Sequence, residues 1–298
     1  MNKTAYILLL LTTIFWGGNA VAGKLAIGHV SPMLLTTARW GLAAAFLAAI
    51  GWRNFAADWP AIKRNAFYLA CLGFAGFTVF NVALYSAVFY TSAINVSIEQ
   101  AGIPMLIFIA NFLLFRQRGS WAQIAGFLIS LAGVALTAGH GDISRLLSLE
   151  VNFGDLLMLA ALVSYAGYTV ALRLKPEVHW QSLMIALTAS AFVTSIPFAL
   201  AEFGAGATIL PDARGWAVIL YAAIFPSVLA QAFYVRGVEL IGANRAGLFV
   251  NLVPVFGTLG SVLLLGEAFH PYHAMALALV LGGIWLAETK RRRTVPAR

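Results

Sequence analysis

Residues 5–26 read AYILLLLTTIFWGGNAVAGKLA, an apolar run with a single charged side chain, Lys24. A helix rises about 1.5 Å per residue and the hydrocarbon core of a membrane is about 30 Å thick, so a run of this length predicts a membrane-spanning helix. Similar runs recur along the whole chain. The sequence therefore predicts a protein built of helices that cross a membrane.

The composition supports this fold class. The chain has 298 residues, of which 61% are hydrophobic and 10% charged, whereas an ordinary soluble domain carries about 25% charged residues. Too few polar side chains are present to cover a water-soluble globule, which excludes a soluble enzyme. At roughly 30 residues per span and connection, the length allows about ten helices and no separate catalytic, nucleotide-binding or nucleic-acid-binding domain.

We predict an all-α integral membrane protein of ten transmembrane helices, interrupted where proline, glycine or charge breaks an apolar run. The charged segment from Asp58 to Arg64 is one such break and follows the end of the second helix. The predicted spans are 5–26, 32–52, 67–90, 93–115, 121–139, 153–174, 180–203, 215–236, 243–265 and 271–289.

The basic residues indicate the orientation. An even number of spans places both termini on one side of the membrane, and the tail Lys290–Arg293 places that side in the cytoplasm, because cytoplasmic segments are enriched in Lys and Arg. In this arrangement the other cytoplasmic segments also hold most of the remaining basic residues. The net charge of +8 then has a topological cause, and nucleic acid is not expected as a partner.

The two halves of the chain resemble each other at an offset of 149 to 150 residues: Trp16–Lys24 (WGGNAVAGK) aligns with Tyr165–Arg173 (YAGYTVALR). Since each half holds five spans, the second enters the membrane in the opposite orientation. Inverted repeats are typical of secondary transporters, in which a central cavity between the repeats alternates its access. The predicted divisions are a first five-helix repeat (1–140), an external linker (141–152), a second five-helix repeat (153–289) and a basic cytoplasmic tail (290–298).

Two ionisable side chains lie well inside predicted spans, Arg39 and Glu99. Each costs about 3 kcal/mol or more in a membrane unless it has a partner or a water-filled cavity. Both lie roughly 10 Å below the outer ends of their helices, so we expect them to pair or to face one polar cavity. Arg39 is a candidate for a substrate carboxylate and Glu99 for an amine or a proton. The alternative is a purely structural ion pair.

A set of aromatic and amide side chains completes the predicted substrate-binding site. Asn and Gln without partners are expensive in lipid, so most should point inward; the alternative is that they only bridge helices, at about 0.6–2 kcal/mol each. With Arg39 and Glu99, the candidates are Trp16, Asn19, Asn81, Tyr85, Gln100, Tyr165, Tyr168, Gln231, Tyr234 and Asn251.

Enzyme motifs are weak in this sequence. Gly139–Asp142 (GHGD) has the form seen in intramembrane aspartyl proteases, but such a site needs a second aspartate at the same depth. The five histidines and the single Cys71 show no metal-ligand spacing, and no phosphate-binding loop is present. We therefore expect neither enzymatic activity nor a metal or cofactor.

Three stretches in combination resemble the EamA family of the drug/metabolite transporter superfamily. They are FWGGNAVAGKLA at 15–26, Arg39 followed by an aromatic residue, and NLVPVFGTLGSVLLLGEAFHPYHAMALALVLGGIWLAE at 251–288. The resemblance implies ten helices in two inverted repeats and proton-linked or facilitated export of small metabolites from bacteria. In members of the family, the fourth helix of each half often ends with Gly-Glu. The second half of this chain has that pair at Gly266-Glu267, whereas the first half has Arg116-Gln117 instead.

The resemblance is strongest to bacterial inner-membrane exporters of amino acids, including aromatic ones. It implies a multi-pass protein of the bacterial inner (cytoplasmic) membrane, whose partners are a small-molecule substrate, the lipid bilayer and, as a candidate, protons. A multidrug exporter of cationic compounds is the alternative within transport. An intramembrane enzyme, which needs a nucleophile and a base at one depth, and a passive channel are the alternatives of other classes.

Overall fold

The computed structural model describes residues 3–116, 121–138, 140–142, 152–241, 246 and 249–289. These residues form helices, and no strand occurs among them. Within these ranges, seven helical segments are long and apolar enough to cross a membrane, and three shorter apolar helices occupy the places of the other predicted spans. The prediction of an all-helical membrane protein is confirmed. The count of ten crossings stays a prediction.

The first half of the chain contains two irregular segments, a π-helix and a 3₁₀ turn, inside long helices. Its elements are α1 (Lys3–Ala26), α2 (Pro32–Arg64), α3 (Ala66–Gly73), the π-helix η1 (Phe74–Val79), α4 (Phe80–Ala87), α5 (Ala93–Glu99), the 3₁₀ turn η2 (Gln100–Gly102), α6 (Ile103–Phe115) and α7 (Trp121–Ala138).

The second half repeats the order of the long helices and has its π-helix at the corresponding place, whereas its 3₁₀ turn follows α9. Its elements are α9 (Phe153–Ala171), the 3₁₀ turn η3 (Leu172–Leu174), α10 (Trp180–Gly204), α11 (Ala213–Ile224), the π-helix η4 (Phe225–Leu229), α12 (Ala230–Ile241), α14 (Val253–Leu265) and α15 (Pro271–Thr289). The predicted tail and most of the predicted linker lie outside the described residues.

The predicted break at Asp58 is wrong, because α2 continues through Pro60 to Arg64. Hydropathy falls after Trp52, but the segment is rich in good helix formers, and one proline removes only one backbone hydrogen bond. The extension is also held from outside. Asp58 Oδ2 accepts a hydrogen bond from the backbone N–H of His179 (2.8 Å), and Asn54 Nδ2 donates to Gln181 Oε1 (2.6 Å).

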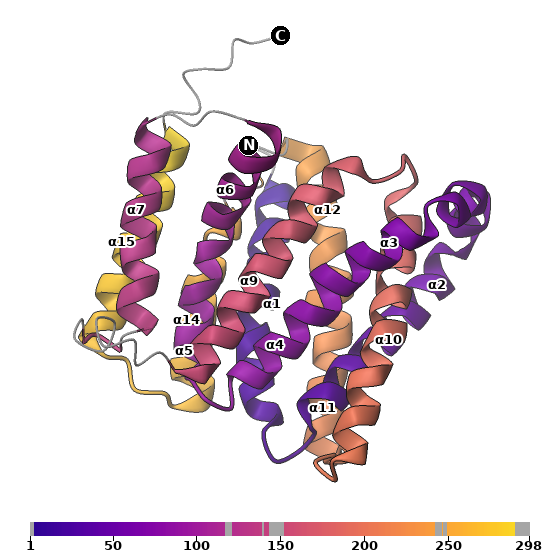
Figure 1. The fold of residues 1–298 in the computed structure, drawn as a ribbon, viewed down its shortest axis with the longest axis horizontal. Helices are drawn as coiled ribbons and strands as arrows, with labels where there is room; N and C mark the ends of the chain where they lie inside the picture. Colours follow the sequence, from indigo (N-terminus) through magenta and orange to yellow (C-terminus); the bar gives the residue numbers. More distant parts are fainter. Residues whose placement is uncertain are drawn as a thin grey trace.

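The two halves are intertwined (Figure 1). Helix α1 packs against α12 and α14, and its counterpart α9 packs against α4 and α6, which are the counterparts of α12 and α14. The pairs α2 with α10 and α7 with α15 each join one helix to its own counterpart. Exchanging the halves therefore leaves the main packing contacts unchanged, as a duplicated structure requires.

Helices α1 and α9 run in opposite directions. Lys24, at the end of α1, donates to the carbonyl groups of Val88 (2.6 Å) and Thr91 (3.0 Å). Asn152, which caps the start of α9, donates to the neighbouring carbonyl of Tyr90 (2.7 Å). The end of α1 thus meets the start of α9, at the opposite end of the molecule from the N-terminus (Figure 1). We call this end the linker end.

Apolar side chains fill the interior between the helices and also cover the outer faces. One buried cluster joins α1, α4 and α9, and another joins α2, α3 and α10. Large apolar residues such as Phe67 and Trp121 are almost fully exposed on the outside. Such an apolar surface suits lipid, and the helices satisfy their backbone polar groups internally, as a membrane span requires.

Candidate functional site

Arg39 of α2 is 4% exposed and is the centre of a buried polar cluster. Its NH1 group donates to Asn19 Oδ1 (2.9 Å), Asn81 Oδ1 (2.6 Å) and the hydroxyl of Tyr85, and its Nε donates to Ser227 Oγ (2.8 Å). We call these five residues the arginine cluster. Elements from both halves of the chain, α1, α4 and η4, supply the partners of Arg39.

The two π-helices help to position this cluster. A π-helix widens one turn, so its carbonyl groups are available to side chains. Asn81 Nδ2 donates to the Phe77 carbonyl in η1 (2.8 Å), which leaves its Oδ1 directed at Arg39. Ser227, inside η4, donates to the carbonyl of Ala222 (2.8 Å) and accepts from Arg39. Both acceptor atoms are thereby fixed in orientation.

Aromatic rings from five elements, α1, α12, α9, η1 and α2, lie beside the cluster. Trp16 packs on Tyr234 with 5.5 Å between ring centroids, and Trp16 Nε1 donates to the Pro226 carbonyl (3.1 Å). Tyr234 interacts electrostatically with Tyr165, and Tyr165 packs on Tyr168 with 5.4 Å between ring centroids. We call this series of rings, which continues through Phe77 to Trp40, the aromatic chain.

The aromatic chain ends on the guanidinium group. Tyr168 packs on Phe77 at 5.5 Å between centroids, and Phe77 stacks on Trp40 at 4.6 Å. The Cζ atom of Arg39 lies 4.6 Å from the Trp40 ring centroid, within the range of a cation–π interaction. The chain therefore consists of Trp16, Tyr234, Tyr165, Tyr168, Phe77 and Trp40.

The arginine cluster has the chemistry of an anion site. The four hydrogen-bond partners of Arg39 in the described part of the chain are neutral, and a buried charge is costly without an opposite charge. A guanidinium group binds carboxylates through two parallel hydrogen bonds. With aromatic rings on one side, the cluster suits a small molecule that has a carboxylate and an apolar group.

The predicted pairing of Arg39 with Glu99 is wrong. The guanidinium group is taken up by the arginine cluster, whereas the carboxyl group of Glu99 interacts with that of Asp155 on α9. Counting residues gives the depth of a side chain but not the direction in which its helix turns it. Asp155 was not selected from the sequence because it lies in the first turn of its helix.

Eight of the twelve predicted site residues lie in the arginine cluster or the aromatic chain. Glu99 lies in the separate carboxyl pair. Gln100 donates to the carbonyl of Val96 in its own chain segment (3.2 Å). Gln231 and Asn251 are half-buried, on α12 and just before α14, and their role in binding stays a prediction. The eight are Trp16, Asn19, Arg39, Asn81, Tyr85, Tyr165, Tyr168 and Tyr234.

Sequence reasoning missed Ser227, Trp40 and Phe77. A signal for Ser227 exists, because at the offset of 149 residues it aligns with Thr78, in the π-helix of the first half. Thr78 Oγ1 donates to the carbonyl of Ala191 on α10 (3.1 Å). The two hydroxyl groups thus occupy the same position in the repeat, and each binds an element of the other half.

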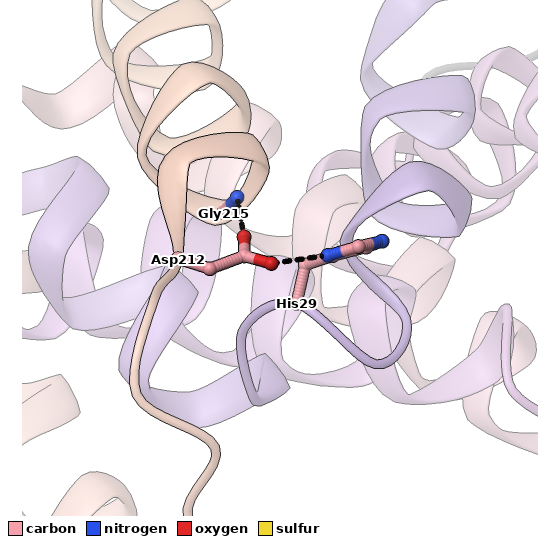
Figure 2. A network of polar contacts seen from close by, with 3 residues as sticks. All are labelled: His29, Asp212 and Gly215. Atoms are coloured by element: carbon pink, nitrogen blue, oxygen red, sulfur yellow. Dashed lines mark hydrogen bonds and ion pairs between the residues drawn. The ribbon is translucent and has the colours of Figure 1, made fainter.

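A second polar contact joins two loops at the linker end (Figure 2). Asp212 caps α11 by accepting from the backbone N–H of Gly215 (2.8 Å), and its other oxygen lies 2.7 Å from His29 Nδ1. The hydrogen bond from Gly215, followed by that from His29, lowers the pKa of Asp212 below its usual value. This contact fixes the turn after α1 to the start of α11.

Comparison with known proteins agrees with this architecture. A model of the EamA-like transporter family matches residues 3–139 and 152–289. YetK of Bacillus subtilis, an uncharacterized transporter, is 28% identical over 97% of this chain and 88% of its own length. YyaM, an uncharacterized transporter of the same organism, is 27% identical over 95% and 93%. A protein of known crystal structure has a TM-score of 0.66 at 22% identity, covering 99% of this chain and 100% of the other.

Proposed function

Since this chain belongs to the EamA-like transporter family and is a membrane transporter, we propose that it exports amino acids, including aromatic ones, or similar small metabolites from the cytoplasm. The transport mechanism in this proposal is alternating access, in which the two intertwined repeats move relative to each other. The protein would reside in the bacterial inner membrane with both termini in the cytoplasm.

The observation that carries the substrate class is the buried Arg39, whose hydrogen-bond partners among the described residues are all neutral and which lies beside the aromatic chain. A substrate carboxylate would replace part of the neutral shell and supply the missing opposite charge. The rings of Tyr168 and Trp40 would pack on the apolar part of the substrate. This division between a few polar anchors and an apolar wall is usual in small-molecule sites.

Transport of radiolabelled L-phenylalanine by the purified protein in liposomes tests this proposal. We expect Arg39→Gln to reduce the transport rate roughly tenfold or more, because a charge-assisted pair of hydrogen bonds is lost. Arg39→Lys should retain part of the rate, since lysine keeps the charge without the forked geometry. Glu239→Gln, at an exposed surface ion pair, is the control. Normal transport by Arg39→Gln would exclude Arg39 from substrate binding.

The alternative, an exporter of cationic drugs, is tested in the same liposomes by adding ethidium. We expect no competition with L-phenylalanine, because the positive charge of Arg39 opposes a cationic substrate at the cluster. Competition by ethidium that survives Arg39→Gln would favour the alternative.

A further inference from the structure

Glu99 and Asp155 form a buried carboxyl pair. Glu99, the last residue of α5, is 3% exposed, and Asp155, in the first turn of α9, is 5% exposed. Their carboxyl groups are close enough to interact with each other. None of the four carboxyl oxygens makes a hydrogen bond of good geometry within the described part of the chain.

Two neighbouring carboxylates cannot both remain ionised in an apolar interior without an opposite charge. The buried cation Arg39 is bound by the arginine cluster, and Lys24 Nζ is bound by two backbone carbonyls. One proton held between the two carboxyl groups would make one of them a donor to the other. Such a proton would supply the hydrogen bond that these oxygens lack.

Polar groups connect the pair with a cavity of about 340 Å³ at the linker end. The Thr91 hydroxyl interacts with Asp155 and accepts from Asn95 Nδ2 (3.1 Å). Asn95 Nδ2 also lies 3.4 Å from His140 Nε2, and Asn95 Oδ1 lies 3.2 Å from His273 Nε2. Thr91, Asn95 and both histidines line the cavity.

Titratable groups of several other elements face this region. Asp155 interacts electrostatically with His140 and with Tyr272, and Tyr272 interacts with Glu267. Glu267 itself is engaged, because it accepts hydrogen bonds from two backbone N–H groups at the start of α5. The titratable groups that line the cavity are Lys24 of α1, Tyr90 between α4 and α5, His140 after α7, Glu267 and His270 between α14 and α15, and Tyr272 and His273 of α15.

We propose that Glu99 and Asp155 share one proton and exchange it with water in this cavity through Thr91 and His140, which Asn95 orients. In the exchange the shared proton leaves a carboxyl oxygen for water, and a proton from water returns to the pair, because two neighbouring carboxylates do not persist in this apolar environment. Proton binding does not depend on the substrate. Its use to drive export rests on the function proposed above.

Infrared spectroscopy of the purified full-length protein tests the shared proton. A protonated carboxyl group has a carbonyl stretch that is distinct from that of a carboxylate and shifts in D2O. We expect this band at neutral pH in the wild type and its loss in both Glu99→Gln and Asp155→Asn. Glu239→Gln, on the exposed surface, should leave it unchanged. A wild-type spectrum without the band, or a band that persists in both variants, would overturn the proposal.

Thr91→Val tests the route, because valine keeps the shape of threonine without its hydroxyl group. We expect the band to remain and its shift in D2O to become several-fold slower. An unchanged exchange rate would show that Thr91 is not on the path and would overturn that part of the proposal.

The coupling is tested with L-phenylalanine in liposomes under an imposed pH gradient. We expect the gradient to accelerate transport in the wild type and to have no effect on Glu99→Gln. An equal response of both proteins would exclude this pair from coupling. If the wild type carries no amino acid but retains the infrared band, the proposed function fails and the proton site stands.

Discussion

Arg116 and Gly266 occupy the same position in the two repeats, and both end their helices in the left-handed conformation, with φ of 52° and 67°. Glycine adopts this conformation freely, whereas a side chain with a Cβ atom is strained there by about 1 kcal/mol. The first repeat therefore carries local strain that the second avoids. The departure from Gly-Glu noted in the sequence has a structural cost at this residue.

Arg116→Gly should accordingly stabilise the protein by about 0.5–1 kcal/mol. The reciprocal change, Gly266→Ala, should destabilise it by a similar amount, because alanine is strained in the left-handed conformation. No atom lies within 4 Å of the added methyl group, so steric contact with neighbours would not contribute. Thermal unfolding of the purified protein in detergent measures both. A lower midpoint for Arg116→Gly would show that the arginine side chain contributes more than the strain it causes.

Asp212 should also contribute to stability on its own, because it caps α11 and binds His29 (Figure 2). Asp212→Ala should lower the unfolding temperature, and Asp212→Asn should lower it less, since asparagine also caps helices well. Because its pKa is lower in the folded protein, the carboxylate stabilises the fold above its unfolded pKa. This contribution is lost as the pH falls through the folded pKa.

The pH dependence gives the control for this residue. The difference in unfolding temperature between the wild type and Asp212→Ala should be fully present at neutral pH and should shrink in acid. A difference that stays constant between neutral and acidic pH would mean that the charge of Asp212 contributes nothing.

At the scale of elements, close helix crossings depend on glycine. Helices α7 and α15 pack together, and a Cβ atom added at Gly283 would lie 2.4 Å from the Gly126 carbonyl oxygen and 2.4 Å from Ser130 Oγ. Its neighbour Gly282 has no atom within 4 Å of the same position. Alanine at position 283 would therefore change both helix packing and helix propensity, whereas alanine at position 282 would change helix propensity alone.

Gly283→Ala should force α7 and α15 apart and destabilise the protein by about 1–3 kcal/mol, the usual range for overpacking. Gly282→Ala is the matched control and should be neutral or stabilising by up to about 1 kcal/mol, because alanine favours helix. Thermal unfolding of both variants gives the comparison. Equal effects of the two substitutions would contradict the close crossing.

The helices themselves were largely predictable, because ends of apolar runs mark where the chain leaves the membrane. The extension of α2 was not, since contacts of Asn54 and Asp58 with α10 hold a helix that hydropathy does not indicate. The π-helices η1 and η4 were also missed. A single widened turn changes the hydrophobic period over too few residues to be recognised in the sequence, although these turns position the acceptors of Arg39.

For the candidate site, the sequence predicted which residues take part but not which of them contact each other. Composition and repeat position selected Arg39, Asn19, Asn81 and Tyr85, and the structure joins them by hydrogen bonds. The partner of Glu99 was not predictable, because it depends on the rotation of α5 against α9. Long-range packing between the two halves sets this rotation.

At the scale of the whole molecule, carboxylates of the second repeat cap helices of the first repeat. Glu202 accepts hydrogen bonds from the backbone N–H groups of Met33 (3.3 Å) and Leu34 (3.2 Å), at the start of α2. Glu267 accepts from those of Ala93 (2.9 Å) and Ile94 (3.0 Å), at the start of α5. A carboxylate at a helix N-terminus is favoured by the helix dipole. Both contacts join the repeats at the linker end.

If the repeats move relative to each other during transport, these contacts must break when the linker end opens. Replacing both carboxylates, in Glu202→Gln with Glu267→Gln, removes two charge-assisted caps and should shift the population toward a state open at that end. Ser227 is a suitable reporter, because it binds Arg39 in the closed interior and is buried.

The measurement is the rate at which a water-soluble maleimide labels Ser227→Cys in a protein whose native Cys71 is replaced by alanine. We expect the double substitution to increase this rate several-fold, and Glu239→Gln, which removes a carboxylate from an exposed ion pair, to leave it unchanged. An unchanged rate in the double variant would mean that the two caps do not close the linker end. The path to Arg39 would then be controlled by the π-helices or the packing around them.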